Sequence, residues 1–394
     1  MLILNIKKLK LKLIKNFEKL THDKRNFHHL FYPQSSIKKN FIFKYCKELK
    51  LSNNSIDRIF LFSDYLNLKS KIINKKKDMW DLISSYKDHR VFMNILSNHD
   101  KSAFLEIIQN FGKTKLGHGF SNYFSYEKLF SSNALKKKES YRLLDTLISL
   151  SEYKRIIKVY NPEQGGFLAY DLDYDELITK IFVYNNKKIT PFNTPNFLFG
   201  FSSNKEFYCF KDLKGIYTAS KLNDLMNLYD LKEVNEIGAG LGYVAYYFSQ
   251  MNNNNFNIYD IPITLLSQAC CLLSSMNENT IHLSGEPTNK HQKISLRPYW
   301  EIFDYDRLDK ILWFNQDSFP EIEIELCKQY IEKISTTKKS IFLSINQEAD
   351  NHNTVDGNQH SVYSLLSSNK NFKLINRSRD FLRQGYIEEL YSLI

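Results

Sequence analysis

The stretch EVNEIGAGLGYVAYYFSQMNNNNFNIYD, residues 233–260, constrains the fold of this chain more than any other. It reads as a short strand, a turn with three glycines at alternate positions, a helix and a second strand that ends in Asp260. Glycine accepts backbone angles that other residues avoid, so such a turn either cradles a ligand or makes a tight connection. We interpret it as the first turn of a βαβ unit that holds a ligand.

Strand and helix patterns alternate from about residue 217 to the C-terminus, which is typical of a doubly wound, mostly parallel sheet. The last two strand patterns, FKLINRSR and GYIEELYSL, have no helix between them and predict an antiparallel closing hairpin at the sheet edge. Before that point, apolar residues recur at three- and four-residue spacing, while residues 188–204 read as a connector. We therefore expect an α/β chain with a mostly helical N-terminal domain (1–214) and a Rossmann-like domain (215–394).

Positive charge is concentrated at the N-terminus of the chain. The formal net charge is +11, and the first 50 residues hold 13 Lys or Arg against 3 Asp or Glu. A protein that follows a nucleic-acid backbone usually carries its basic residues on the body of the fold, so we expect no nucleic-acid partner. Residues 1–20 lack the continuous apolar stretch of a signal peptide. We expect a cytoplasmic protein whose basic arm is a solvated helix or contacts the inner face of a membrane.

The glycine turn departs from the dinucleotide-binding pattern GxGxxG. Counted from Gly238, that pattern needs glycine at the position of Tyr243, so the turn is GxGxG. Glu236 precedes the first glycine by two positions, which suits a cationic ligand and does not suit pyrophosphate. Asp260, at the end of the second strand, can accept both ribose hydroxyls or can cap the next helix. Together these features favour adenosine with an amino-acid tail.

With the later stretch FNQDSFPEI, these residues resemble the class I S-adenosylmethionine-dependent methyltransferases. More narrowly, they are similar to the sugar O-methyltransferases of bacterial glycan loci, and the resemblance covers about residues 217–394. It implies a methyltransferase sheet and S-adenosylmethionine as the cofactor, with Glu286 as a further candidate near the adenine. The residues that it places at the cofactor are Glu236, Gly238, Ala239, Gly240, Gly242, Asp260, Ile261, Asn315 and Gln316.

Methyl transfer to a sugar hydroxyl needs a base, and SINQEADNHNTVDGNQHSVY offers candidates behind the fifth strand. We favour His352, since histidine accepts a proton near neutral pH, with Glu348 or Asp350 as its orienting partner. The same cluster can be a polar surface loop without a catalytic role, and His118 is an outside candidate. Its histidines match no recognised zinc spacing, and the five cysteines form no CxxC pair, so we predict no metal.

The sequence thus predicts an O-methyltransferase that acts on a sugar of a surface glycan or of its precursor. Tyr299, Trp300 and Trp313 can line the acceptor pocket or belong to the core. A nucleic-acid methyltransferase is disfavoured because NQDSF stands where an (N/D)PP(Y/F) motif is expected. The alternative is a non-catalytic partner that keeps the fold and docks on a membrane or on a glycan-assembly enzyme. The number of chains in the assembly stays open.

Overall fold

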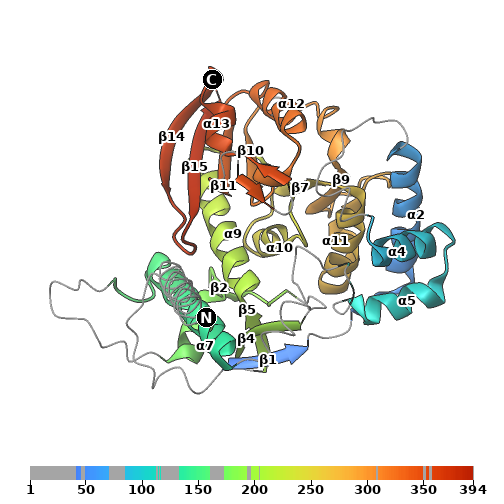
Figure 1. Cartoon of the computed structure of the whole chain (residues 1–394), viewed down its shortest axis with the longest axis horizontal. Helices are drawn as coiled ribbons and strands as arrows, with labels where there is room; N and C mark the ends of the chain where they lie inside the picture. Colours follow the sequence, from blue (N-terminus) through green and yellow to red (C-terminus); the bar gives the residue numbers. More distant parts are fainter. Residues whose placement is uncertain are drawn as a thin grey trace, which may run out of the picture.

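An eight-stranded, mostly parallel sheet forms the centre of the C-terminal half of the protein (Figure 1). The computed structural model describes residues 41–45, 49–70, 85–111, 114, 116, 133–159, 173–192, 197–203, 205–307, 309–348, 352–354 and 357–393. In spatial order the strands are β14 (Phe372–Arg379), β15 (Tyr386–Leu393), β11 (Ile341–Gln347), β10 (Ile311–Gln316), β6 (Glu233–Ile237), β7 (Asn255–Asp260), β9 (Ile294–Pro298) and β8 (Ile281–Leu283).

The order of the strands reverses at β6. The chain first places β7 on one side of β6 and later places β10 on the other side, and both pairs are parallel. Every residue of β6 is buried, as expected of a strand that is covered on both faces. In doubly wound sheets, ligands bind beyond the carboxyl ends of the strands at such a reversal. The loops after β6 and β10 are therefore the place to look for a site.

The closing hairpin and the doubly wound sheet are confirmed. β15 is antiparallel to both β11 and β14, and β14 lies at the edge of the sheet. Sequence analysis did not predict β9, which pairs in parallel with β7 and separates it from β8. Its five residues, ISLRP, are too few to show the alternation that distinguishes a short strand from a loop.

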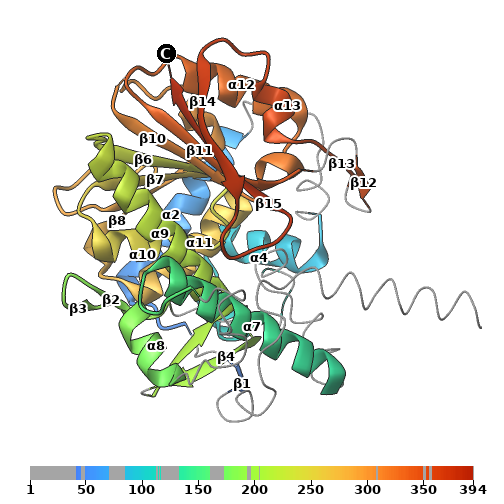
Figure 2. The same ribbon diagram turned by 90° about the vertical axis from the view of Figure 1, so that its left-hand side faces the viewer.

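Helices cover both faces of this sheet (Figure 2). α10 lies between β6 and β7 in the chain, and eight of its nine residues are buried. This is why YVAYYFSQM carries no polar face. The helices of this part are α9 (Phe210–Leu228), α10 (Tyr243–Met251), α11 (Pro262–Ser275), α12 (Ile324–Ser335) and α13 (Val362–Leu366), with 3-10 turns η5 (Glu278–Thr280), η6 (Tyr299–Ile302) and η7 (Phe319–Glu321).

The described residues before α9 are mostly helical, as predicted, but they also contain a small antiparallel sheet, β1-β4-β5. Residues 197–203, expected to be part of a connector, form its central strand. Asp100 begins a helix as its sequence position suggests, since its side chain accepts from the Ala103 amide at 3.0 Å. The elements are β1 (Phe41–Tyr45), α2 (Asn53–Ser70), α4 (Lys87–Ser97), α5 (Lys101–Gln109), α7 (Asn133–Tyr153), α8 (Tyr174–Ile181), β2 (Val183–Tyr184), β3 (Lys187–Lys188), β4 (Phe197–Ser203) and β5 (Glu206–Cys209).

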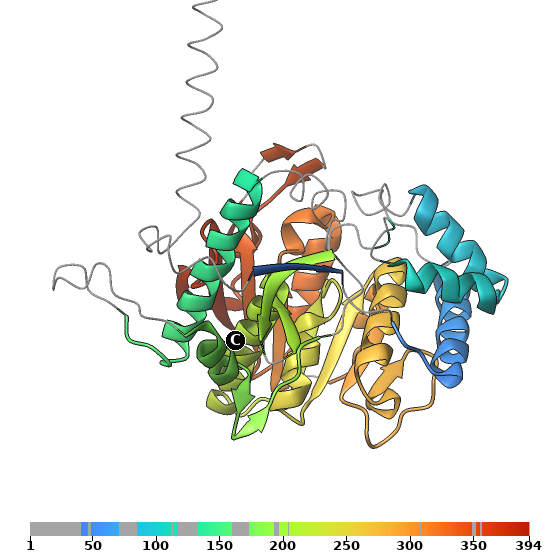
Figure 3. The same cartoon turned by 90° about the horizontal axis from the view of Figure 1, so that it is seen from below.

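Polar contacts and packing join the helical part to the sheet. α2 packs beside α11, close to the β8 edge (Figures 1 and 3). Arg58 of α2 donates two hydrogen bonds of 2.7 Å to the Glu286 carboxylate. α9 runs across residues 214 and 215, the predicted domain boundary, and that division stays a prediction. No helix in the described part of the chain is long and apolar enough to cross a membrane.

Candidate functional site

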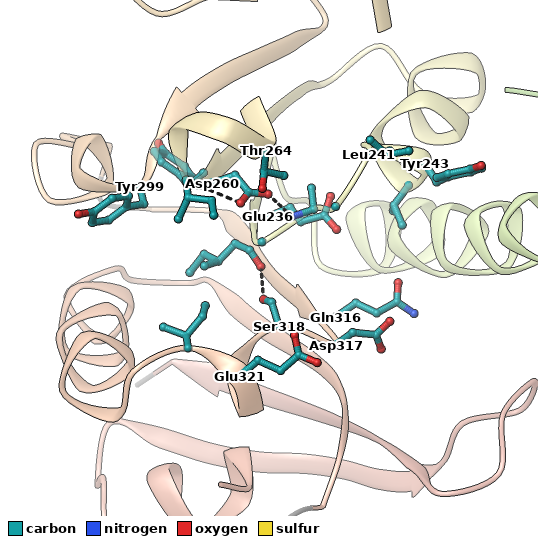
Figure 4. Close-up of a pocket in the computed structure, with 18 of the residues that line it drawn as sticks. Glu236, Leu241, Tyr243, Asp260, Thr264, Tyr299, Gln316, Asp317, Ser318 and Glu321 are labelled. Carbon is teal, nitrogen blue, oxygen red and sulfur yellow. Dashed lines mark hydrogen bonds between the residues drawn. The ribbon is translucent and has the colours of Figure 1, made fainter. Parts of the chain in front are cut away.

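A cavity of about 340 Å³ lies beyond the carboxyl ends of the strands, at the reversal of strand order (Figure 4). Its volume is in the range of small-molecule sites. The loops after β6, β7 and β10 form its walls, and the first turns of α9 close one side. Of the residues predicted at the cofactor, the lining includes Glu236, Gly238, Ala239, Gly240, Asp260, Ile261 and Gln316.

The glycine turn is shaped partly by contacts within the protein. Gly238, Gly240 and Gly242 all have positive φ. A Cβ on Gly238 would lie 2.2 Å from Oγ of Ser318, which follows β10. A Cβ on Gly242 would lie 3.3 Å from Leu272 of α11, and Gly242 begins α10 without lining the cavity. Two of the three glycines therefore make room for protein atoms.

Asp260 ties the two loops of the βαβ unit together. Its carboxylate accepts from the Ala239 amide at 3.0 Å, from the Ile261 amide at 2.8 Å and from Nε2 of Gln268 at 2.9 Å. Burial raises the pKa of Asp260 to about 7, although these donors oppose the shift. These three donors occupy most of the about four lone-pair sites of the carboxylate, and Asp260 lines the cavity wall.

Glu236 is the most unusual group of the site. Its Oε2 is buried and has no hydrogen-bond partner among the described residues. Burial, with the nearby Asp260 adding to it, raises the pKa of Glu236 to about 8, while Lys214 opposes the rise. A buried carboxylate oxygen without a donor is costly, so this position is suited to a cationic or hydrogen-donating ligand.

The two amides at the end of β10 have different positions. Asn315 is fully buried and does not line the cavity; its Nδ2 donates to the Ile237 carbonyl at 2.7 Å and so holds β6 and the β10 loop together. Gln316 lines the cavity, and its Nε2 has no partner within the described structure. Figure 4 shows Gln316 and Asp317 at one end of the cavity and Tyr299 at the other.

A network of buried charges lies next to Gln316. Lys214 of α9 and Arg383 each pair with one oxygen of Asp317, and Arg383 also pairs with Asp380 at 3.1 Å. Burial would raise the pKa of Asp317, but the two cations hold it below its usual value. Burial together with Arg383 lowers the pKa of Lys214 to about 7. Lys211, one turn earlier on α9, also lines the cavity.

The predicted base cluster does not line the cavity in its described part. Glu348 pairs instead with Arg377 of β14, and Asp350 lies outside the described residues, as does His118. His352 begins β12 (His352–Thr354), whose side chains are not described, and β12 pairs with β13 (Gly357–Gln359). Nε2 of Gln347, a lining residue, donates to Oε1 of Gln359 at 2.8 Å and joins this hairpin to the cavity wall.

The three aromatic residues considered for the acceptor pocket lie in different places. Tyr299 lines the cavity, whereas Trp300 and Trp313 do not, and Trp313 is a fully buried core residue. Glu286 faces Arg58 and also lies outside the lining. Among the described residues, no group of three His, Cys, Asp or Glu side chains could hold a metal ion.

Several polar lining residues were not predicted from the sequence, among them Lys211, Lys214, Ser318 and Tyr386. Ser318 stood within the quoted FNQDSFPEI and could have been noted there. The lysines precede the first strand and fell in the predicted N-terminal domain, so no motif pointed to them. The signal available in the sequence was that the two lysines are three residues apart in a helical segment, which places them on one face.

The sequence matches no protein-family model and no curated protein. Solved structures resemble part of the chain at low identity. A protein from Pyrococcus horikoshii is 11% identical with a TM-score of 0.35, over 46% of this chain and 90% of that chain. A SAM-dependent methyltransferase from Anabaena variabilis is 10% identical with a TM-score of 0.32, over 45% and 84% of the two chains. Magnesium protoporphyrin IX methyltransferase from Synechocystis, solved with bound SAH, is 11% identical with a TM-score of 0.32, over 46% and 85%. These similarities cover less than half of the chain, so a reaction has to be argued from the cavity itself.

Proposed function

We propose that this protein is an S-adenosylmethionine-dependent O-methyltransferase acting on a sugar hydroxyl of a surface glycan or of its precursor. The observation that carries the cofactor is the buried Oε2 of Glu236, near the end of the first strand of the βαβ unit, which has no partner among the residues that the structure describes. The amino group of S-adenosylmethionine is a cationic donor of the kind that this oxygen lacks. Pyrophosphate would place negative charge against the same carboxylate.

We place the ribose, the adenine and the methionine part of the cofactor one after another along the cavity wall. Asp260 faces the ribose, and the donors Ala239, Ile261 and Gln268 leave about one of its four lone-pair sites for a ribose hydroxyl. The side chains of Ile261 and Tyr299, which line that end of the cavity, hold the adenine between them. The methionine end then points toward Gln316 and the charge network.

S-adenosylmethionine supplies a methyl group on a positively charged sulfur. The contribution of this chain is to align the accepting hydroxyl with that carbon, and such placement is worth about 7–11 kcal/mol at best. Gln316, Gln347 and Tyr386 line the cavity with hydrogen-bonding groups, which suit an acceptor with several hydroxyls.

A base that removes the hydroxyl proton typically adds about 10²–10⁴-fold to the rate. We keep His352 as the candidate, with Glu348 or Asp350 orienting it. The hydrogen bond between Gln347 and Gln359 anchors its hairpin at the cavity, which supports this role. The pairing of Glu348 with Arg377 favours Asp350 as the orienting partner.

The cofactor is tested by calorimetric binding of S-adenosylhomocysteine to wild type, to Asp260→Ala and to the more conservative Asp260→Asn. We expect micromolar binding to wild type, weakened about tenfold or more by Asp260→Ala, the scale of a lost hydrogen bond to a charged group. Asp306→Ala, at an exposed carboxylate away from the cavity, is the matched control. A folded wild type that binds neither S-adenosylhomocysteine nor S-adenosylmethionine would refute the proposal.

Transfer is then tested with labelled S-adenosylmethionine and a panel of free, nucleotide-linked and lipid-linked sugars. Label incorporated into a sugar at a hydroxyl supports the proposed reaction. Cofactor binding without transfer to any member of the panel would favour the non-catalytic partner, since a methyltransferase fold that only docks elsewhere can keep its cofactor site.

A further inference from the structure

The first turns of α9 place two lysines on the cavity wall. Lys211 and Lys214 are three residues apart on one helix, so they project from the same face, and both line the cavity. Lys214 has a counter-ion, Asp317. For Lys211, no carboxylate of the described residues lies within salt-bridge distance. Lys211 is therefore a half-buried lysine that lines the cavity and has no direct counter-ion among the described residues.

The surroundings of Lys211 carry an excess of positive charge. Burial lowers the pKa of Lys211 and Asp317 opposes this shift, while Arg383 and Arg142 lower the pKa further. Both oxygens of Asp317 are already engaged, one by Lys214 and one by Arg383. Asp317, the carboxylate that acts on Lys211, is thus shared with Lys214 and Arg383. An additional anion would therefore be stabilised at this wall.

The polar atoms without partners also differ between the two sides of the cavity. On the cofactor side, Oε2 of Glu236 is an acceptor without a partner among the described residues. Beside the charge network, Nε2 of Gln316 is a donor without a partner in the described part of the chain, as is Nη2 of Arg383, which does not line the cavity. Gln316 is 6% exposed and lines the same cavity as Lys211, so it offers a buried donor to a ligand there.

We propose that Lys211 binds a negatively charged group, a carboxylate or a phosphate, on the sugar acceptor. The acceptor is then an acidic or phosphorylated sugar, with Gln316 as a second donor to the same group. This inference rests on the proposed methyl-transfer function and narrows its substrate class.

The other anion that could reach this wall is the carboxylate of the cofactor's methionine part. The charges that act on Glu236, where we place the amino group, are those of Asp260, Lys214 and Asp317. Lys211 is not among them, although it lies on the same face of α9. We therefore assign Lys214 to the cofactor side of this wall and Lys211 to the acceptor.

The test compares three sugars as probes on protein saturated with S-adenosylhomocysteine: glucose, glucuronate and glucose 6-phosphate. We expect wild type to bind at least one charged sugar about tenfold more tightly than glucose, the scale of one charge-assisted hydrogen bond. Preference for glucuronate identifies a carboxylate, and preference for glucose 6-phosphate identifies a phosphate.

Lys211→Met should abolish this preference and leave the affinity for S-adenosylhomocysteine unchanged, while Lys211→Arg should restore it. Lys180→Met, at an exposed lysine of α8 outside the cavity, is the control for loss of charge. Thermal melting verifies that each variant is folded, and Lys211→Gln replaces Lys211→Met if the latter is not.

Two results would overturn the inference without touching the proposed function. One is wild type that binds S-adenosylhomocysteine but prefers neither charged sugar over glucose, including the case in which no sugar binds. The other is a Lys211→Met variant with weakened S-adenosylhomocysteine affinity, which would assign Lys211 to the cofactor carboxylate. Absence of S-adenosylhomocysteine binding to wild type is a separate outcome that refutes the proposed function itself.

Discussion

Replacing Glu236 by glutamine tests the central carboxyl through the pH dependence of stability. Burial and the nearby Asp260 raise the pKa of Glu236 to about 8 in the folded protein, whereas an unfolded glutamate titrates near 4.3. The folded state therefore binds this proton more tightly than the unfolded state does. The stability that this bound proton contributes is complete below about pH 4 and is lost as the pH rises through 8.

The size of the effect follows from the shift. A rise from about 4.3 to about 8, at 1.36 kcal/mol for each pKa unit, corresponds to roughly 5 kcal/mol between the two limits. This is an upper value, because Asp260 has a raised pKa and titrates together with Glu236. We expect Glu236→Gln to be within about 1 kcal/mol of wild type in stability at pH 5 and to exceed it by roughly 2–5 kcal/mol at pH 9.

Urea unfolding at pH 5, 7 and 9 measures the difference between the two proteins. Glu332→Gln, at an exposed glutamate of α12, controls for the loss of a carboxylate elsewhere. If wild type and Glu236→Gln lose stability in parallel between pH 5 and pH 9, Glu236 does not carry the proton and the reasoning fails.

The same carboxyl predicts proton release when the cofactor binds. A cationic amino group beside Glu236 favours its ionised form, so the bound complex holds less of the proton than the free protein does. Calorimetry of S-adenosylhomocysteine binding at pH 7, repeated in buffers of different ionisation enthalpy, should show release of up to about one proton for wild type. Glu236→Gln should lose this release. An equal number of protons in both proteins would place the amino group elsewhere.

Two further substitutions test the loop and the base. Gly238→Ala should lower the free energy of unfolding by roughly 2–5 kcal/mol in urea denaturation, because φ is 73° and the new Cβ would lie 2.2 Å from Ser318 Oγ. Adding Ser318→Gly should recover the part of this loss that comes from the clash. Strictly additive effects of the two substitutions would contradict the contact. His352→Ala should lower kcat for the sugar acceptor about 10²–10⁴-fold and leave the affinity for S-adenosylhomocysteine unchanged. An unaltered kcat would mean that the hairpin of β12 and β13 is a surface loop without a catalytic role.

Much of the sheet could be predicted from the sequence because its strands and helices follow simple periods. α10 is an apolar segment of nine residues between two strand patterns, and the hairpin of β14 and β15 was visible as two strands without a helix between them. β9 could not be found in this way, since five residues that end in Arg297 and Pro298 fit a loop equally well. Its place between β7 and β8 is decided by tertiary pairing.

Only some of the residues that line the cavity could be predicted from the sequence. Motif reasoning reads residues that follow strands, and it therefore found Glu236, Asp260 and Gln316. Lys211 and Lys214 reach the cavity from a helix that precedes the first strand. Asp317, which pairs with Lys214, lies 103 residues further along the chain, and Arg383, which pairs with Asp317, lies another 66 residues on. Such a network has no local pattern in the sequence.

The glycine turn shows how a correct motif can have a different physical cause from the expected one. Close approach of a ligand was the reason suggested by three glycines in five positions. Gly238 instead makes room for Ser318, and Gly242 for Leu272, so these two positions would need glycine even without a ligand. The pattern by itself therefore predicts a tightly packed strand–turn–helix. What indicates a ligand, and a cationic one, is the neighbouring carboxylate oxygen of Glu236, which the fold buries and leaves without a donor among the described residues.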